Sequence, residues 1–249
     1  MWLWRLVTVG HSPSDHAWFA GLSCTIRRVL LPSDPDNIDG AWQWLQSISA
    51  PTAAASGENE EFGAAVALEE RQALIGCPDC GAAGKAFFYS THTSGLYSEL
   101  QSGPTLSVPG TPENGLGAGD RFGVAVALWN YRTAIVGSAN KGVYWFWGDA
   151  GTAGAPASPA WSAGVKLTSA DMIDGVVHDR IAISGSILAV GSSSSSSDRI
   201  HLWKPVDPSD LSAGWTEAPP VSPMTPGFGA SLAVAGTVVF VGHPSFGTV

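Results

Sequence analysis

Arg121-Phe-Gly-Val-Ala-Val-Ala-Leu128 decides the fold, because its pattern recurs along this chain of 249 residues. Glu61-Phe-Gly-Ala-Ala-Val-Ala-Leu68 matches it at six of eight positions, and Gly227-Phe-Gly-Ala-Ser-Leu-Ala-Val234 is a third copy. Two weaker copies lie at Phe19–Ile26 and Arg180–Ser184. Each copy has an anchor, its first large apolar residue, and the anchors are 43, 60, 59 and 47 residues apart: Phe19, Phe62, Phe122, Ile181 and Phe228. The spacing predicts an internal repeat of about 50 residues.

Three more apolar segments follow each anchor. The second segment is a short apolar run that ends in glycine, at Gly76, Gly137, Gly191 and Gly242. The third is aromatic, as in Gly142-Val-Tyr-Trp-Phe-Trp147, and the fourth is looser, near Ser98–Leu100, Trp161–Leu167 and Trp215. Short runs rich in Val, Ile and aromatics, bounded by Gly, Pro, Ser and Asp, predict strands. Four strands per repeat predict an all-β fold, a β-propeller built from four-stranded antiparallel blades.

The anchors and the glycines have different expected roles in packing. We expect the anchor Phe to wedge between adjacent sheets. Gly63, Gly123 and Gly229 directly follow Phe, and they remove a side chain where strands crowd near the axis. The third, aromatic strand would fill the wider gaps between sheets farther out, and this placement accounts for most of the 11 Trp.

The repeated order of Phe-Gly, apolar strand, Gly and aromatic strand resembles the FG-GAP repeat, whose best-known example is the integrin α-chain propeller. The resemblance covers roughly residues 16–249 and is closest to the calcium-free form of large microbial and protist surface proteins. No Gly-Ala-Pro is intact, and Ile181-Ala182 replaces Phe-Gly. The resemblance implies a role in adhesion or protein interaction, and an extracellular or cell-surface location for the parent protein. The integrin-type calcium loops do not carry over, because the turns between the first and second strands are too short and too poor in carboxylates.

The repeat divides the chain into one array of blades. The boundaries are a partial blade at 1–15, blades at 16–52, 53–110, 111–170 and 171–220, and a partial blade at 221–249. Val7–His11 reads as a second strand without its first, so we expect a fragment of about four to five blades from a larger propeller. Open sheet edges in such an array invite self-association.

Composition excludes several classes of partner. The chain carries 12 Lys and Arg against 21 Asp and Glu, a formal net charge of −9, so nucleic acid and anionic membranes are poor partners. No apolar run is long enough for a transmembrane helix, and the first ten residues lack the basic region and cleavage site of a signal peptide.

Cysteine and acidic clusters give weak metal signals. Cys77-Pro-Asp-Cys80 lacks both a thioredoxin-like context and a second pair of zinc ligands, so we expect two small apolar residues in a strand-end loop, with a local disulfide as the main alternative. Asp34 and Asp36 fit positions 1 and 3 of a Ca²⁺ loop, but Ile38 stands at position 5 and Asp39 is out of register. This pattern favours a solvated turn, with adventitious Ca²⁺ binding as the alternative. No cofactor and no metal site is therefore predicted.

The loops before the anchors are the candidate binding site. In a propeller, equivalent loops gather on one face, so an acidic rim with two arginines could form from Glu61, Asp120, Arg121, Asp179 and Arg180. The alternative is structural: Asp120 and Asp179 bond turn amides, and the two arginines pair locally.

The sequence shows no catalytic centre. No Gly-x-Ser-x-Gly elbow or His-Glu-x-x-His motif is present, and His201 alternates with apolar residues as a partly exposed strand residue would. The leading hypothesis is a non-enzymatic adhesion or protein-interaction scaffold, whose partner is an unknown protein or glycan. The alternatives are a glycan-binding or hydrolytic propeller, which would need carboxylates and aromatics around one cavity, and a vestigial fragment without activity of its own.

Overall fold

The structure is a computed structural model that describes most of the repeat array. The described residues are 6–10, 25–30, 43–49, 61–69, 72–90, 100–106, 108, 115–148, 161–169, 177–193, 198–221 and 227–243. Phe19 and the acidic turn with Asp34, Asp36 and Asp39 lie outside the described residues.

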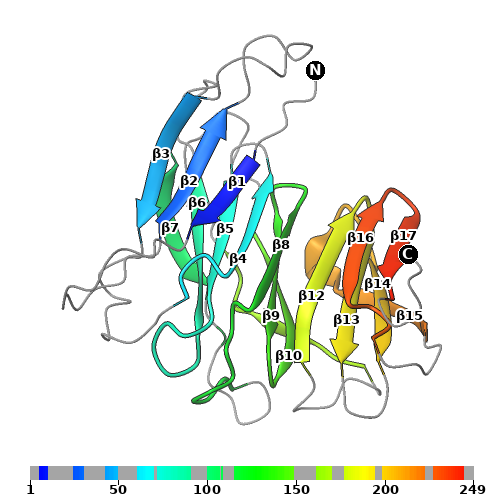
Figure 1. Cartoon of the computed structure of the whole chain (residues 1–249). Helices are drawn as coiled ribbons and strands as arrows, with labels where there is room; N and C mark the ends of the chain where they lie inside the picture. Colours follow the sequence, from blue (N-terminus) through cyan, green and yellow to red (C-terminus); the bar gives the residue numbers. More distant parts are fainter. Residues whose placement is uncertain are drawn as a thin grey trace.

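Five antiparallel sheets follow one another along the chain (Figure 1). The first sheet has three strands: β1 (Leu6–Gly10), β2 (Thr25–Leu30) and β3 (Gln43–Ser49). The second has four: β4 (Ala65–Glu69), β5 (Gln72–Cys77), β6 (Lys85–Ser90) and β7 (Gln101–Leu106). The third has β8 (Ala125–Trp129), β9 (Thr133–Ser138), β10 (Gly142–Trp147) and β11 (Val165–Leu167).

The last two sheets complete the described array. The fourth sheet has β12 (Val177–Ser184), β13 (Ile187–Ser193), β14 (Arg199–Pro205) and β15 (Trp215–Val221), with the 3-10 helix η2 (Leu211–Ala213) before β15. The fifth sheet is a hairpin of β16 (Ser231–Ala235) and β17 (Val238–Gly242). Each four-stranded sheet is a meander in which neighbours in sequence are neighbours in the sheet, which confirms the all-β prediction and the four-stranded blades.

The same hydrogen bond repeats in three of the sheets. The N–H of the glycine after the anchor Phe donates to the carbonyl of the glycine that ends the second strand, at 2.8–3.0 Å: Gly63 to Gly76, Gly123 to Gly137, and Gly229 to Gly242. Strand register agrees, because the residue two positions after the first glycine pairs with the second glycine: Ala65 with Gly76, Ala125 with Gly137, and Ser231 with Gly242. The repeat seen in sequence is therefore a repeat in backbone structure.

The first strands of successive sheets lie next to one another. β4 contacts β8, β8 contacts β12, and β12 contacts β16, and Figure 1 shows β4, β8 and β12 side by side in the middle of the molecule. An inner row of first strands, each followed by its own sheet, is the arrangement of propeller blades.

Three apolar clusters fill the gaps between the first four sheets. Phe62, 1% exposed, packs with Ile48 of the first sheet and Ile75 of the second. Phe122, also 1% exposed, lies with Leu74 of the second sheet and Tyr144 of the third, and its ring meets Tyr144 edge to face at 5.7 Å. A third cluster joins the third and fourth sheets through Ile135, Trp145, Leu188 and Trp203 among others. The two anchors Phe62 and Phe122 thus wedge between sheets as predicted.

Backbone packing is closest between the second and third sheets. A Cβ on Gly84 would overlap backbone atoms of Phe122, and these two residues form a parallel β-bridge. Only glycine permits so close an approach, and Gly84 also has a φ of 88°, which disfavours other residues.

Register corrects one of the predicted anchors. Arg180 pairs with Gly191, so Arg180 occupies the position of Ala65 and Ala125 in their sheets, not that of Glu61 and Arg121. Ile181 directly follows Arg180, so it matches Val66 and Val126 rather than Phe62 and Phe122, and it packs against the third cluster. The alignment through Ile181-Ala182 was wrong by four positions, because an Ile-Ala-Ile strand looks like a degenerate Phe-Gly copy.

The first sheet also differs from the expected blade limits. Residues 6–10, which the sequence assigned to a separate partial blade, pair with β2 in register from Leu6↔Val29 to Gly10↔Thr25. Among the described residues, β1 is therefore the strand that pairs with β2 on the side opposite β3, and Phe19–Cys24 lie outside those residues.

Candidate functional site

The candidate site is the end of the second and third sheets at which their first strands begin. Because antiparallel strands alternate in direction, this end also carries the turn between the second and third strands of each sheet. We call these turns, residues 61–64, 78–84, 117–124 and 139–141, the turn rim. The rim contains three of the predicted site residues, Glu61, Asp120 and Arg121.

Backbone hydrogen bonds lock the two halves of the turn rim together. The N–H of Gly119 donates to the carbonyl of Ala82 at 2.9 Å, and the N–H of Phe122 donates to that of Ala83 at 2.7 Å. Asn140 adds a side-chain bond from its Nδ2 to the carbonyl of Gly119 at 2.8 Å. The two backbone bonds join turns of neighbouring sheets, and the Asn140 bond joins two turns of the third sheet.

Arg121 connects the two sheets through carboxylates. Its Nη2 lies 2.5 Å from Oε2 of Glu61, and its Nε lies 3.7 Å from Oδ1 of Asp79. The three side chains are 41%, 35% and 34% exposed, so all three present charge to solvent. Glu61 and Arg121 stand at equivalent positions before their Phe, with left-handed φ values of 46° and 51°. This ion pair brings two of the predicted site residues together.

Asp120 has a structural role in the rim. The residue is only 7% exposed, and its Oδ2 accepts a hydrogen bond of 2.6 Å from the N–H of Gly117. Its carbonyl accepts from the hydroxyl of Ser138 at 2.6 Å. The carboxylate of Asp120 therefore fixes the turn and presents little surface to a ligand. This is the structural role, a bond to a turn amide, that was the alternative to a binding role.

Asp179 and Arg180 form a separate pair in the fourth sheet. Nη1 of Arg180 lies 3.1 Å from Oδ1 of Asp179. Since Arg180 lies inside β12 and matches Ala65 by register, the pair is not the counterpart of Asp120 and Arg121. The structure thus joins Glu61 to Arg121, and Asp179 to Arg180, as two distinct contacts.

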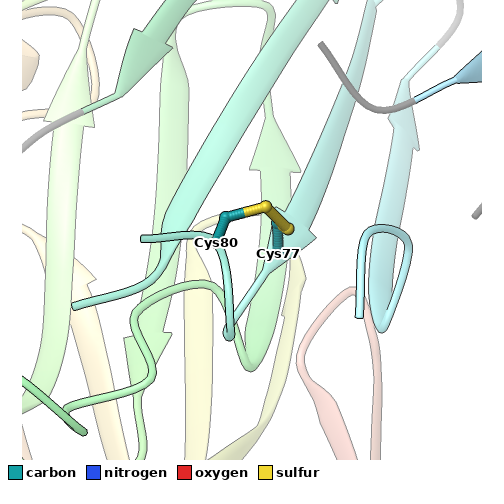
Figure 2. The surroundings of a disulfide bond; sticks show 2 residues. All are labelled: Cys77 and Cys80. Carbon is teal, nitrogen blue, oxygen red and sulfur yellow. A yellow bond between two sulfur atoms is a disulfide. The ribbon is translucent and has the colours of Figure 1, made fainter. Parts of the chain in front are cut away.

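A disulfide between Cys77 and Cys80 closes the rim turn that carries Asp79 (Figure 2). The two Cα atoms are 5.3 Å apart, and the residues are 0% and 1% exposed. The expectation of two apolar thiols was therefore wrong, and the alternative of a local disulfide is confirmed. The bond restrains the backbone on both sides of Asp79, so it helps to hold that carboxylate near Arg121.

A serine, a histidine and a glutamate form a chain of hydrogen bonds inside the fourth sheet. Nε2 of His201 lies 3.2 Å from Oγ of Ser192, and its Nδ1 lies 3.0 Å from Oε1 of Glu217. These are the connections of a Ser-His-acid triad. His201, however, is 0% exposed and Ser192 5%, and the imidazole stacks on Trp203 at a centroid distance of 5.6 Å. The prediction of a partly exposed His201 was wrong, because its partners come from residues distant in sequence.

The described part of the chain gives two further findings on sites. Its His, Cys, Asp and Glu residues form no group of three that could hold a metal ion. Within the same ranges, no helix is both long and apolar enough to cross a membrane.

Comparisons with known proteins give a likeness of shape only. No protein-family model matches the chain, and no curated protein matches it. A solved structure described as "Structure of Dos1 propeller" is similar at a TM-score of 0.49 and 14% identity, with 87% of this chain and 52% of that chain covered. This chain therefore spans about half the length of the solved chain it resembles. The propeller-like, all-β architecture rests on the sheet order and on the row of first strands described above.

Proposed function

We propose that this chain is a non-enzymatic propeller repeat protein that acts as a protein-interaction scaffold, with the turn rim as its contact surface. The observation that supports this most is Arg121 of the third sheet, which is partly exposed yet held by Glu61 and Asp79 of the second sheet. Arginines that are fixed before binding are favoured at the centres of protein interfaces, because little side-chain entropy is lost on association.

The charge of the chain suggests the kind of partner. The rim offers the carboxylates of Glu61 and Asp79 around one guanidinium, and the whole chain has a formal net charge of −9. A partner with a basic surface would be attracted over a distance and could share the two carboxylates with Arg121. We therefore infer a basic protein surface as the partner.

An adhesion role outside the cell is part of this proposal. The disulfide at Cys77 and Cys80 supports it, because disulfides persist in oxidising compartments and are rare in reducing ones. The resemblance of the repeat to FG-GAP propellers is the second support.

The hydrolase alternative draws on Ser192, His201 and Glu217. A catalytic serine must meet its substrate, whereas Ser192 is 5% exposed and His201 is fully buried against Trp203. Labelling the folded chain with a fluorophosphonate tests this alternative. We expect no labelling of Ser192, and stoichiometric labelling that is lost in His201→Ala would establish a hydrolase in place of a scaffold.

The scaffold proposal is tested by binding with matched variants. The folded chain is screened against an array of purified extracellular proteins and an array of glycans, in parallel with the double variant Glu61→Gln/Arg121→Gln. Lys204→Gln is the control, because Lys204 is exposed on β14 of the fourth sheet. We expect a protein hit that the double variant weakens at least about tenfold, a change of 1.4 kcal/mol in binding free energy. The same hit should be unchanged in Lys204→Gln.

Three outcomes would overturn the proposal. The first is an absence of protein hits, and the second is a set of hits that the double variant binds as well as the original chain does. The third is binding to glycans alone with loss in the double variant, which would assign the rim to a carbohydrate ligand.

A further inference from the structure

The hairpin of β16 and β17 is an incomplete sheet within the described residues. By register, β17 is the second strand of its sheet, because Ser231↔Gly242 repeats the pairs Ala65↔Gly76 and Ala125↔Gly137. Its counterparts β5 and β9 lie between two strands each: β5 between β4 and β6, and β9 between β8 and β10. Among the described strands, β17 pairs with β16 alone, so no described strand occupies the third position of this sheet.

One face of this hairpin is apolar and exposed. The pair Ala233↔Phe240 occupies the position of Ala67↔Leu74 and Ala127↔Ile135, in which Leu74 and Ile135 face the next sheet of the array. Leu74 and Ile135 are 0% exposed, whereas Phe240 is 53% exposed and Val238, on the same face, 51%. The exposed face of the hairpin thus carries apolar side chains at positions that are buried in the complete sheets.

The edge of β17 carries none of the usual protection against pairing. The hairpin closes through a two-residue turn between Ala235 and Val238, and alternate residues of β17 bond to β16. The backbone groups of Val239 and Val241 therefore point toward the open edge. Natural edge strands are blunted by charge, proline or bulges, and Val-Val-Phe-Val-Gly has none of these.

We propose that a second copy of this chain pairs with β17 along its open edge, antiparallel and about a two-fold axis at Phe240. The two hairpins then form one four-stranded sheet, in the order β16, β17, β17 and β16, which is the strand number of the complete sheets in this chain. In those sheets the third strand is antiparallel to the second, and a two-fold axis produces the same orientation. The β17 strand of the second copy thus takes the place that β6 holds beside β5 and that β10 holds beside β9.

The two-fold arrangement also brings exposed side chains of the two copies into lateral contact. With the axis at Phe240, Val239 of one copy pairs with Val241 of the other, which satisfies the outward backbone groups of both. Phe240 then lies directly opposite its own symmetry mate, at the close spacing of cross-strand neighbours. A Glu at this position would place two like charges opposite each other.

The test measures the mass of the full chain in solution by sedimentation over a dilution series. We expect the original chain to reach twice its mass of 25.7 kDa at high concentration, and Phe240→Glu to stay monomeric. Val206→Glu is the matched control, because Val206 is 58% exposed but directly follows β14 of the fourth sheet and is not part of the hairpin. This control should dimerise like the original chain.

Cross-linking gives a second readout that does not depend on losing an interaction. Phe240→Cys should form a disulfide-linked dimer under mild oxidation, whereas Val206→Cys in the same background should not. In sedimentation, the proposal is overturned if the original chain remains monomeric at every concentration, if Phe240→Glu still dimerises, or if Val206→Glu loses the dimer. In cross-linking, it is overturned if the two cysteine variants cross-link equally.

Discussion

Gly76 and Gly123 meet across the gap between the second and third sheets so closely that a Cβ on Gly76 would overlap the carbonyl oxygen of Gly123. The two glycines hold the two repeated glycine positions: Gly76 lies near the end of the second strand of its sheet, and Gly123 directly follows the anchor Phe of its sheet. Their contact shows why the repeat keeps glycine at both positions: the inner backbones of neighbouring sheets touch there.

Gly76→Ala should therefore destabilise the fold. The added methyl group meets backbone, which cannot move aside as a flexible side chain can, so we expect a loss of about 1–3 kcal/mol or more in the free energy of unfolding. Urea unfolding followed by Trp fluorescence measures the change. Gly117→Ala is the control, since a Cβ there would lie an ordinary 3.7 Å from Oδ2 of Asp120. Equal stability of the two variants would refute the close contact.

Truncating the anchor Phe should cost different amounts in different sheets. Phe122 is 1% exposed between two sheets, so Phe122→Ala should lower the free energy of unfolding by about 3–5 kcal/mol. Phe228 is only half-buried and its ring lies 6.0 Å from His243, so Phe228→Ala should cost clearly less. Chemical unfolding of both variants ranks them. A larger effect at Phe228 would mean that the fifth sheet is packed more fully than the structure shows.

Reduction of the disulfide should lower stability by a moderate amount. Because Cys77 and Cys80 are three residues apart, the closed loop is short, and the loop-entropy relation gives about 2 kcal/mol. Thermal unfolding of Cys77→Ser/Cys80→Ser against the oxidised chain measures the effect. A thiol assay in denaturant should find two more thiols after reduction than before. Finding the same number before and after reduction would rule out the bond.

Alkaline pH should weaken the fold through Tyr89. Burial raises the pKa of Tyr89 from 10.0 to about 12. Below pH 10 the phenol is protonated in both the folded and the unfolded chain, and its contribution to stability is complete. Between pH 10 and 12 the unfolded chain loses this proton more readily, so stability falls as the pH rises. Absorbance of tyrosinate during a pH titration should show a late ionisation step that Tyr89→Phe removes.

The second and third sheets are the part that sequence predicts best. Phe62-Gly63 and Phe122-Gly123 lie where strands of neighbouring sheets approach closely, and this approach requires glycine. Because the requirement is the same in each copy, the same residues recur in the sequence. The strands that follow them were expected at nearly the ranges found. The fourth strand of the second sheet was the exception, because Gln101–Leu106 contains Gly and Pro and is mostly exposed.

Features that depend on distant partners were missed. Asp79 joins the site only because Arg121, from another sheet, reaches it, and nothing in the local sequence marks that contact. His201 looks like an alternating strand residue, yet Ser192 and Glu217 satisfy both of its ring nitrogens and allow full burial. The misplaced anchor at Ile181 has a similar cause, since the register of β12 is set by Arg180 opposite Gly191 and not by the apolar pattern.

Scalar couplings across hydrogen bonds, measured by NMR on the deuterated chain, test the repeat most directly. The predicted result is a coupling from the amide of Gly63 to the carbonyl of Gly76, from Gly123 to Gly137, and from Gly229 to Gly242. Three couplings at equivalent positions would establish that the sheets are copies of one unit. Couplings that join these glycines to unrelated residues, or a helical pattern across Val124–Leu128 or Val143–Trp147, would contradict it.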